Sequence, residues 1–181
     1  MDYSKDIEEV LITKEQLAKR VAELGAQISK EYEGEKLTLI CILRGASVFF
    51  ADLLRQITTD CEIDFIAVSS YGAGTTSSGE VKLVKDLSST IEGENVIIVE
   101  DIMDTGVTLS YLKRMLQARN PKSIKICACV DKPERRKVDI KADYIGFAIP
   151  NEFIVGYGLD YNERYRNLPD ICVLAPEVYS D

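Results

Sequence analysis

Runs of apolar residues, separated by helical patterns, constrain the fold of this chain more than any other feature of its sequence. LTLICIL (37–43), the core of NVIIVED (95–101) and SIKICACV (123–130) are rich in strand-forming residues, and their continuous hydrophobicity is typical of strands covered on both faces. Helical patterns follow the first two runs, at 46–57 and 107–120. Because this alternation is that of parallel β-α-β units, we predict an α/β fold with a central, mostly parallel sheet flanked by helices.

The remaining segments fit a single domain over residues 1–181, since no repeat, low-complexity tract or long linker divides the chain. TKEQ, from Thr13, resembles a capping box, and apolar residues at helical spacing predict a helix from about Lys14 to Tyr32. The small and polar stretch GAGTTSSG (72–79) predicts a mobile loop. Further strands are predicted in EIDFIAVSSY (62–71), VKLVKDL (81–87), ADYIGFAI (142–149) and ICVLA (171–175).

Composition and charge exclude several kinds of partner. The net charge is −8 and no long Lys/Arg block is present, which disfavours nucleic acid and anionic lipid as partners. No apolar run reaches the roughly 18 residues of a membrane span, and the acidic N-terminal segment is unlike a secretory signal, so we predict a cytoplasmic location. The chain contains no histidine, so any acid–base chemistry falls to carboxylates, lysine, tyrosine or cysteine.

The five cysteines predict reduced, buried thiols, because they are odd in number and lie mostly within apolar runs. Cys127 and Cys129 form a C-x-C pair whose side chains should share one face of a strand. A zinc site is disfavoured, since the sequence offers neither a histidine nor a second cysteine pair.

The stretch VIIVEDIMDTGVTL (96–109) is the strongest candidate for a functional site. Glu100 and Asp101 fall at the predicted end of a buried strand, where parallel sheets bind ligands. The turn that follows leads into a helix whose first N–H groups can bind a phosphate, and it consists of Asp104, Thr105, Gly106, Val107 and Thr108.

The two acids before this turn suit ribose hydroxyls or Mg²⁺, and the spacing and lysine of a nucleotide P-loop are absent. One loop can then hold a ribose 5-phosphate at both ends. The structural alternative is that Glu100 and Asp101 belong to a solvated turn that caps the helix, with Asp104 as its N-cap.

VIIVEDIMDTGVTLS resembles the phosphoribosyl-pyrophosphate signature of the type I phosphoribosyltransferases, and its E-D-x-x-D-T-G form resembles the 6-oxopurine branch, the hypoxanthine-guanine phosphoribosyltransferases. CILRGA, SSYGAGTTSSGEVKLVKDL, VDKPERR and NEFIVGYGLDYNERYRNLPD match the other blocks of the family in the same order, over nearly the whole chain. The resemblance implies the type I fold with a small hood built from terminal segments, Mg²⁺ as cofactor, and a homodimer or homotetramer.

The resemblance also implies a pyrophosphate site and a catalytic loop. Arg44 and Gly45 in LRG, with Arg166 in YRNLPD, would bind pyrophosphate, since the planar guanidinium fork suits phosphate oxygens. The structural alternative for Arg44 is an arginine that caps a strand end in water, and Arg166 in isolation would be read as a surface arginine. Ser70 and Tyr71 match the start of the mobile loop that would keep water from the reacting sugar, and no role is assigned to Lys82 or Lys85 within it.

The resemblance assigns the purine site and a second metal position to residues between Lys132 and Asp160. Lys132 would donate to the purine 6-oxo oxygen, Phe153 would stack on the base, and Ile154 would offer backbone polar groups to its 2-position. Asp160 would hold a second Mg²⁺, partly through water, in addition to the metal position at Glu100 and Asp101. The structural alternatives are a solvated loop lysine, a core phenylalanine and a surface aspartate in a turn.

Together these residues predict transfer of a phosphoribosyl group from phosphoribosyl pyrophosphate to N9 of hypoxanthine or guanine, with Asp104 managing a proton near purine N7. A phosphoribosyl-pyrophosphate-sensing RNA-binding regulator is the main alternative, because such proteins share this fold and loop, but the chain has no basic stripe. The tripeptide DTG also suggests an aspartic protease, a class that needs paired carboxylates in an all-β setting.

Overall fold

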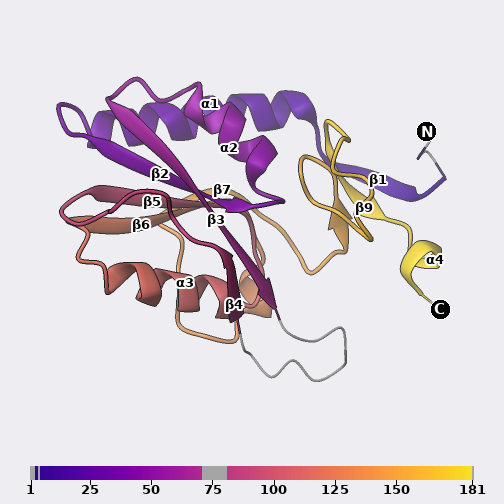
Figure 1. Ribbon diagram of the computed structural model, residues 1–181. Helices are drawn as coiled ribbons and strands as arrows, with labels where there is room; N and C mark the ends of the chain where they lie inside the picture. Colours follow the sequence, from indigo (N-terminus) through magenta and orange to yellow (C-terminus); the bar gives the residue numbers. More distant parts are fainter. Residues whose placement is uncertain (1–2, 4, 71–80, 181) are drawn as a thin grey trace.

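A six-stranded sheet crosses the centre of the molecule (Figure 1). The computed structural model describes residue 3 and residues 5–70 and 81–180. Along the sheet the order is β4-β3-β2-β5-β6-β7, and all neighbours are parallel except β3 and β4. The predicted mostly parallel sheet is confirmed, with strands β2 (Leu37–Leu43), β3 (Cys61–Ser70), β4 (Val81–Lys85), β5 (Asn95–Met103), β6 (Ser123–Asp131) and β7 (Tyr144–Ala148).

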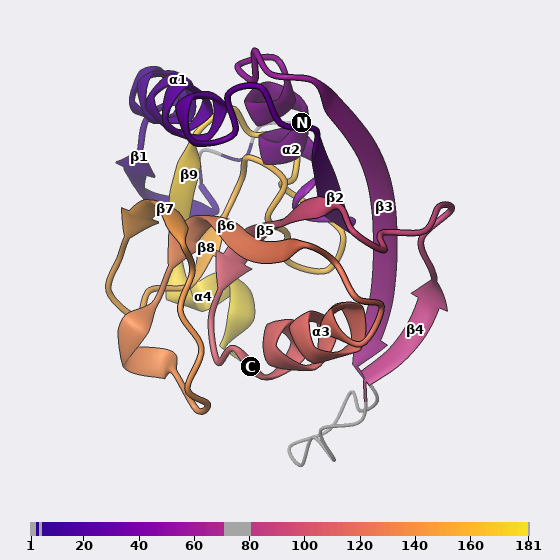
Figure 2. The same ribbon diagram turned by 90° about the vertical axis from the view of Figure 1, so that its left-hand side faces the viewer.

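Helices cover both faces of this sheet, which explains the continuous apolar runs. Figures 1 and 2 show α1 (Lys14–Glu31) and α2 (Ser47–Leu54) on one face and α3 (Val107–Gln117) on the other. Side chains alternate along each strand: Cys41 of β2 packs in the cluster under α1 and α2, whereas its neighbour Ile40 packs in the cluster under α3. Both sets of strand side chains are therefore buried.

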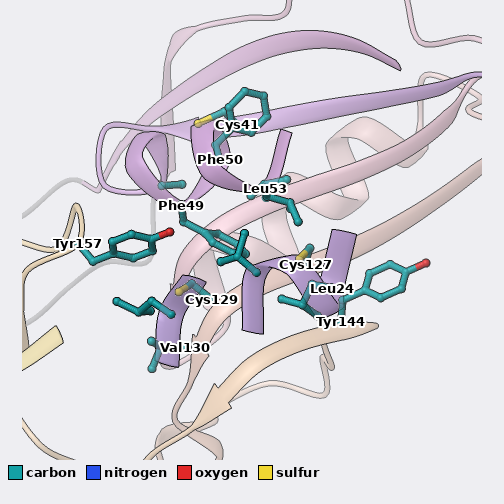
Figure 3. Packing of buried hydrophobic residues seen from close by; sticks show 14 of the residues in the cluster. Leu24, Cys41, Phe49, Phe50, Leu53, Cys127, Cys129, Val130, Tyr144 and Tyr157 are labelled. Carbon is teal, nitrogen blue, oxygen red and sulfur yellow. The ribbon is translucent and has the colours of Figure 1, made fainter. Parts of the chain in front are cut away.

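The larger of these clusters contains three of the five cysteines as buried side chains. Figure 3 shows Cys41, Cys127 and Cys129 among Phe49, Leu53 and other apolar side chains. Burial raises the pKa of the Cys127 thiol to about 12, so the thiolate that binds metals is disfavoured there. The shared face of the C-x-C pair is confirmed, and all five cysteines are free thiols, although one, Cys61, is only partly buried.

A second, smaller sheet forms the hood, which we define as β1 (Ile7–Ile12), β8 (Ile154–Val155), β9 (Ile171–Leu174) and the short helix α4 (Pro176–Tyr179). Its strands are antiparallel in the order β1-β9-β8, and Figure 1 shows it beyond the ends toward which β2 and β3 run. The hood built from terminal segments is thus confirmed. The predicted ICVLA strand lies in the hood as β9, and the sequence reading missed β1 and β8.

Several predicted boundaries differ from the structure. The main difference concerns β5, which continues to Met103 because β6 still pairs with it at Ile102 and Met103, two residues beyond the predicted end at Asp101. The segment 72–79 lies outside the described residues. In the part of the chain that the structure describes, no helix is long and apolar enough to span a membrane.

The predicted capping box of α1 is confirmed, and it makes a stability test. Thr13 accepts a hydrogen bond from the Gln16 N–H at 3.3 Å, and the Gln16 side chain accepts one from the Thr13 N–H at 2.8 Å. We expect Thr13→Ala to lower the free energy of unfolding by about 1 kcal/mol, since a helix donor loses its acceptor. Urea denaturation measures this, with the exposed Thr58→Ala as the matched control; equal stabilities of the two variants would contradict the prediction.

Candidate active site

Two loops lie side by side at the topological switch point, where the order of the strands in the sheet reverses. From β2 the chain adds β3 on one side and later β5 on the other, so the loops after β2 and β5 leave the sheet side by side. Gly45, in the loop after β2, shows how close they are: a Cβ atom there would lie 1.7 Å from Oδ2 of Asp101. Only glycine permits this approach, which brings Asp101 against the Arg44–Gly45 turn.

The turn before α3 presents backbone donors that the helix itself does not pair, although the Val107 N–H donates to Oγ1 of Thr105 at 3.5 Å. Gly106 precedes the first helical residue, Val107, with a left-handed φ of 78° and no side-chain cap. A Cβ at Gly106 would lie 2.6 Å from Cγ2 of Ile140, so both conformation and space require glycine. The alternative that Asp104 is the N-cap is wrong, since Gly106 occupies that position. The first N–H groups of α3 have no acceptor within the helix, as an anion site requires.

The two acids upstream of this turn form a strongly interacting pair. Both are partly buried in the last part of β5, and the Asp101 N–H donates to Oε1 of Glu100 at 3.2 Å. Burial, together with the charge of Asp101, raises the pKa of Glu100 well above its ordinary value. Among the described residues, no group of three or more acids or cysteines forms a preformed metal site. The pair therefore offers oxygen donors that a cation would have to share with substrate or water.

A cavity of about 540 Å³ opens between the ends of β5 and β6 and the hood. It brings together most residues that the sequence predicted for the base and the metal. A cavity of about 620 Å³ lies elsewhere, between α1 and residues 56–59, and lacks such a gathering of acids and aromatic rings. The smaller cavity is lined by Asp101, Ile102, Asp104, Lys132, Arg135, Asn151, Glu152, Phe153, Ile154, Leu159, Asp160 and Tyr179.

Lys132 is buried at the wall of this cavity, with 7% of its surface exposed, so the solvated-loop alternative is wrong. Its Nζ donates to the carbonyl oxygen of Glu152. Burial lowers the pKa of Lys132, an effect that the Asp104 carboxylate opposes. The ammonium keeps further donors for a ligand oxygen.

Phe153 and Ile154 bring the hood to the cavity. The Phe153 side chain is 38% exposed, so it is not an ordinary core residue. Its carbonyl accepts from the Leu174 N–H at 2.8 Å, which makes the 153–174 pair a hydrogen-bonded one. In an antiparallel ladder the next pair, Ile154 with Val173, then points its backbone groups away from the partner strand. The N–H and C=O of Ile154 therefore face the open edge of β8.

The two predicted pyrophosphate arginines share a carboxylate. Arg44 and Arg166 both pair with Glu163, and Arg166 also pairs with Oδ1 of Asp160 at 2.7 Å. The Arg44 side chain is largely exposed and that of Arg166 is mostly covered. Asp160 also accepts from the Glu163 N–H at 2.9 Å, as in a turn. The arginines thus already hold anionic oxygens, which an incoming phosphate group would replace.

Asp104 is held by an arginine that sequence reasoning missed. Nε of Arg135 lies 2.8 Å from Oδ1 of Asp104, and Nη2 lies 3.3 Å from Oδ2. The neighbouring Arg136 donates to the carbonyl oxygens of Met103 and Asp104. Arg135 and Arg136, which follow Lys132, therefore fix the turn before α3. No spacing pattern in the sequence predicts the contact between Arg135 and Asp104.

The predicted catalytic loop falls mostly outside the described residues. Tyr71 is among the residues that the structure does not describe, and Ser70 is described by its backbone as the last residue of β3. Lys85 ends β4, where its Nζ donates to the Phe65 carbonyl at 2.7 Å, so it stabilises the edge of the sheet.

Comparison with known proteins agrees with this geometry. The model of the phosphoribosyl transferase domain matches residues 9–162, and the chain belongs to that family. It is 55% identical to the hypoxanthine-guanine phosphoribosyltransferase of Bacillus subtilis over 96% of this chain and 97% of the relative. The crystal structure of a hypoxanthine phosphoribosyltransferase from Staphylococcus aureus superimposes with a TM-score of 0.95 and 51% identity, covering 98% of this chain and 96% of that one.

A further group of relatives is much longer. The chain is 52% identical to the bifunctional protein TilS/HprT of Listeria monocytogenes over 97% of its own length, and it spans 27% of the length of that relative. The shared segment is thus found both in longer bifunctional proteins and in chains of nearly the same size.

Proposed function

We propose that this chain transfers the 5-phosphoribosyl group of phosphoribosyl pyrophosphate to N9 of hypoxanthine or guanine, giving a nucleoside monophosphate and pyrophosphate. The observation that supports the proposal is that a glycine turn at the start of α3, a pair of arginines and a cavity with a buried lysine lie together at the carboxyl ends of the central strands. The relatives that align over nearly their full length bear the name of this activity.

The phosphate and sugar would lie along the turn between β5 and α3. The N–H groups from Gly106 to Thr108 bind the 5-phosphate, with hydroxyls of Thr105 and Thr108 as further donors. Glu100 and Asp101 accept hydrogen bonds from the ribose hydroxyls. Arg44 and Arg166 exchange carboxylate oxygens for those of pyrophosphate, which they stabilise as it leaves.

The base would enter the cavity beneath the hood. Lys132 donates to the 6-oxo oxygen, the backbone of Ile154 contacts the 2-position, and the ring stacks on Phe153. As N9 bonds to C1′, the bond from C1′ to the pyrophosphate oxygen breaks, and the purine loses a proton. Asp104 takes this proton near N7, since its carboxylate lines the same cavity. Positioning of the two reactants contributes much of the rate.

Mg²⁺ suits the carboxylates at the end of β5, because it prefers hard oxygen ligands and is commonly held by one or two carboxylates plus substrate phosphates. Glu100 and Asp101 would hold one ion, and Asp160 would hold a second, partly through water. When bound, these ions supply positive charge that stabilises the leaving pyrophosphate.

A direct assay tests this function. The protein is incubated with phosphoribosyl pyrophosphate, Mg²⁺ and one of hypoxanthine, guanine, xanthine or adenine, and nucleotide absorbance is followed. We expect nucleotide from hypoxanthine and guanine, its loss when EDTA removes the metal, and its return when Mg²⁺ is restored. The activity fails as a proposal if no base yields nucleotide, and the metal role fails if EDTA has no effect.

Two alternative functions separate clearly from this one. The mixed α/β fold contradicts the all-β setting of an aspartic protease. An RNA-binding regulator would form a salt-sensitive RNA complex at micromolar concentration, which a filter-binding assay would detect.

The oligomeric state and the location in the cell remain predictions. Light scattering would test for a homodimer or homotetramer, and cell fractionation would test for a cytoplasmic location.

A further inference from the structure

Two tyrosines surround the ring of Phe153, the aromatic residue of the proposed base site. The Tyr179 ring is stacked on it, with centroids 4.6 Å apart and planes 18° apart. Tyr161 forms a T-shaped pair with it, with centroids 5.5 Å apart and planes at 88°. Phe153 directly precedes the two-residue edge strand β8 and is 38% exposed, so its ring would otherwise have few contacts to fix its orientation.

The turn that carries Tyr179 is attached to the rest of the hood, although the Tyr179 side chain is itself 36% exposed. It is the last residue of α4, a helix of four residues directly after β9. The neighbouring Val178 packs against the small cluster of Val155, Tyr165 and Leu174, and the Ala175 N–H donates to the Asp6 carbonyl at 2.8 Å. The C-terminal turn is therefore attached to β1 and β9, and through Tyr179 it contacts the base site.

An aromatic ring has two faces, and Tyr179 covers one face of Phe153. The cavity that Phe153 lines also contains Asp104, Lys132 and Tyr179 itself. Because Tyr179 occupies one face of Phe153, a purine bonded to Asp104 and Lys132 in this cavity would have to stack on the other face. Phe153 would then lie between two rings, one from the protein and one from the substrate. Offset stacking on both faces restricts a ring to one orientation.

We propose that Tyr179 is a positioning residue for the purine: it stacks on one face of Phe153 and thereby holds that ring in the plane on which the base stacks. The proposal rests on the function proposed above. It gives the C-terminal turn a role in binding the base and none in binding phosphoribosyl pyrophosphate, whose proposed contacts lie on the loops after β2 and β5 and at Arg166.

Steady-state kinetics with hypoxanthine test this role. Tyr179→Ala is expected to raise the KM for the base by about three- to tenfold, the range of a single aromatic pair, with kcat and the KM for phosphoribosyl pyrophosphate nearly unchanged. Tyr179→Phe keeps the ring and should restore the wild-type KM. Glu177→Ala, an exposed change in the same helix, is the matched control.

A double-mutant cycle separates support of Phe153 from a general structural role. In a Phe153→Ala background, Tyr179→Ala should have no further effect on the base KM, and the thermal stabilities of the four proteins should show coupling between the two positions. An unchanged or lower KM in Tyr179→Ala would overturn the proposal, the lower value because the ring would then be blocking the base. If the stabilities show coupling but the wild type uses no purine, the proposed function fails while the contact between the rings stands. Additive stabilities would overturn the support of Phe153 by Tyr179.

Discussion

Asp104→Asn is expected to lower kcat by about 10²- to 10⁴-fold, with small changes in the KM of both substrates. Asparagine keeps the size of the side chain and one oxygen acceptor, but it cannot take up the proton that the purine loses. Asp104 lines the cavity proposed for the base and belongs to the turn proposed for the phosphoribosyl group, so its carboxylate would lie between the two reactants. Single-turnover measurements with excess enzyme would isolate the chemical step.

The ion pair with Arg135 needs its own control, because Asp104→Asn weakens it as well as removing the proton acceptor. Arg135→Gln weakens the same pair from the other side and leaves the carboxylate in place. The pair is roughly 40% exposed, so water screens it, and we expect only a few-fold effect of this variant on kcat. Equal losses in the two variants, or full turnover in Asp104→Asn, would show that Asp104 does not handle the proton.

The centre of the sheet could be predicted from the sequence because β2, β5 and β6 are largely buried on both faces. The run Leu37–Leu43 is apolar except for Thr38 and became β2 with the same bounds. The hood gave weaker signals. In β1, Ile7–Ile12, adjacent glutamates interrupt the apolar pattern, and β8 consists of two residues, too few for any period to show. Both strands form through pairing with β9, a contact far along the chain.

The candidate site divides in the same way. The turn between Asp104 and Thr108 could be located because a local motif places a glycine and hydroxyls at the start of a helix. The contacts of Arg135 with Asp104 and of Tyr179 with Phe153 join residues that are far apart in sequence. They depend on how loops from different strands meet, so neither residue type nor spacing revealed them. The burial of Lys132 likewise follows from tertiary packing, since its local sequence VDKPERR is highly charged.

Lys132→Gln is expected to lower kcat/KM for hypoxanthine by about 10- to 150-fold, which corresponds to about 1.5–3 kcal/mol for a hydrogen bond from a charged donor. The ammonium is buried in the wall of the cavity and is bound to the Glu152 carbonyl on one side, so it can donate to a 6-oxo oxygen from a fixed place. Glutamine can reach a similar position, but it carries no charge.

The change should also alter the choice of base. An ammonium group only donates hydrogen bonds, so it opposes a 6-amino group, whereas glutamine can donate or accept. The ratio of kcat/KM for hypoxanthine to that for adenine should therefore fall in Lys132→Gln. Lys137→Gln removes an exposed lysine from the same segment and should leave both values unchanged. Because loss of the Glu152 contact could loosen the loop, urea denaturation must show that the variant remains folded under assay conditions. If a folded variant keeps the wild-type ratio, the buried ammonium does not discriminate between the bases.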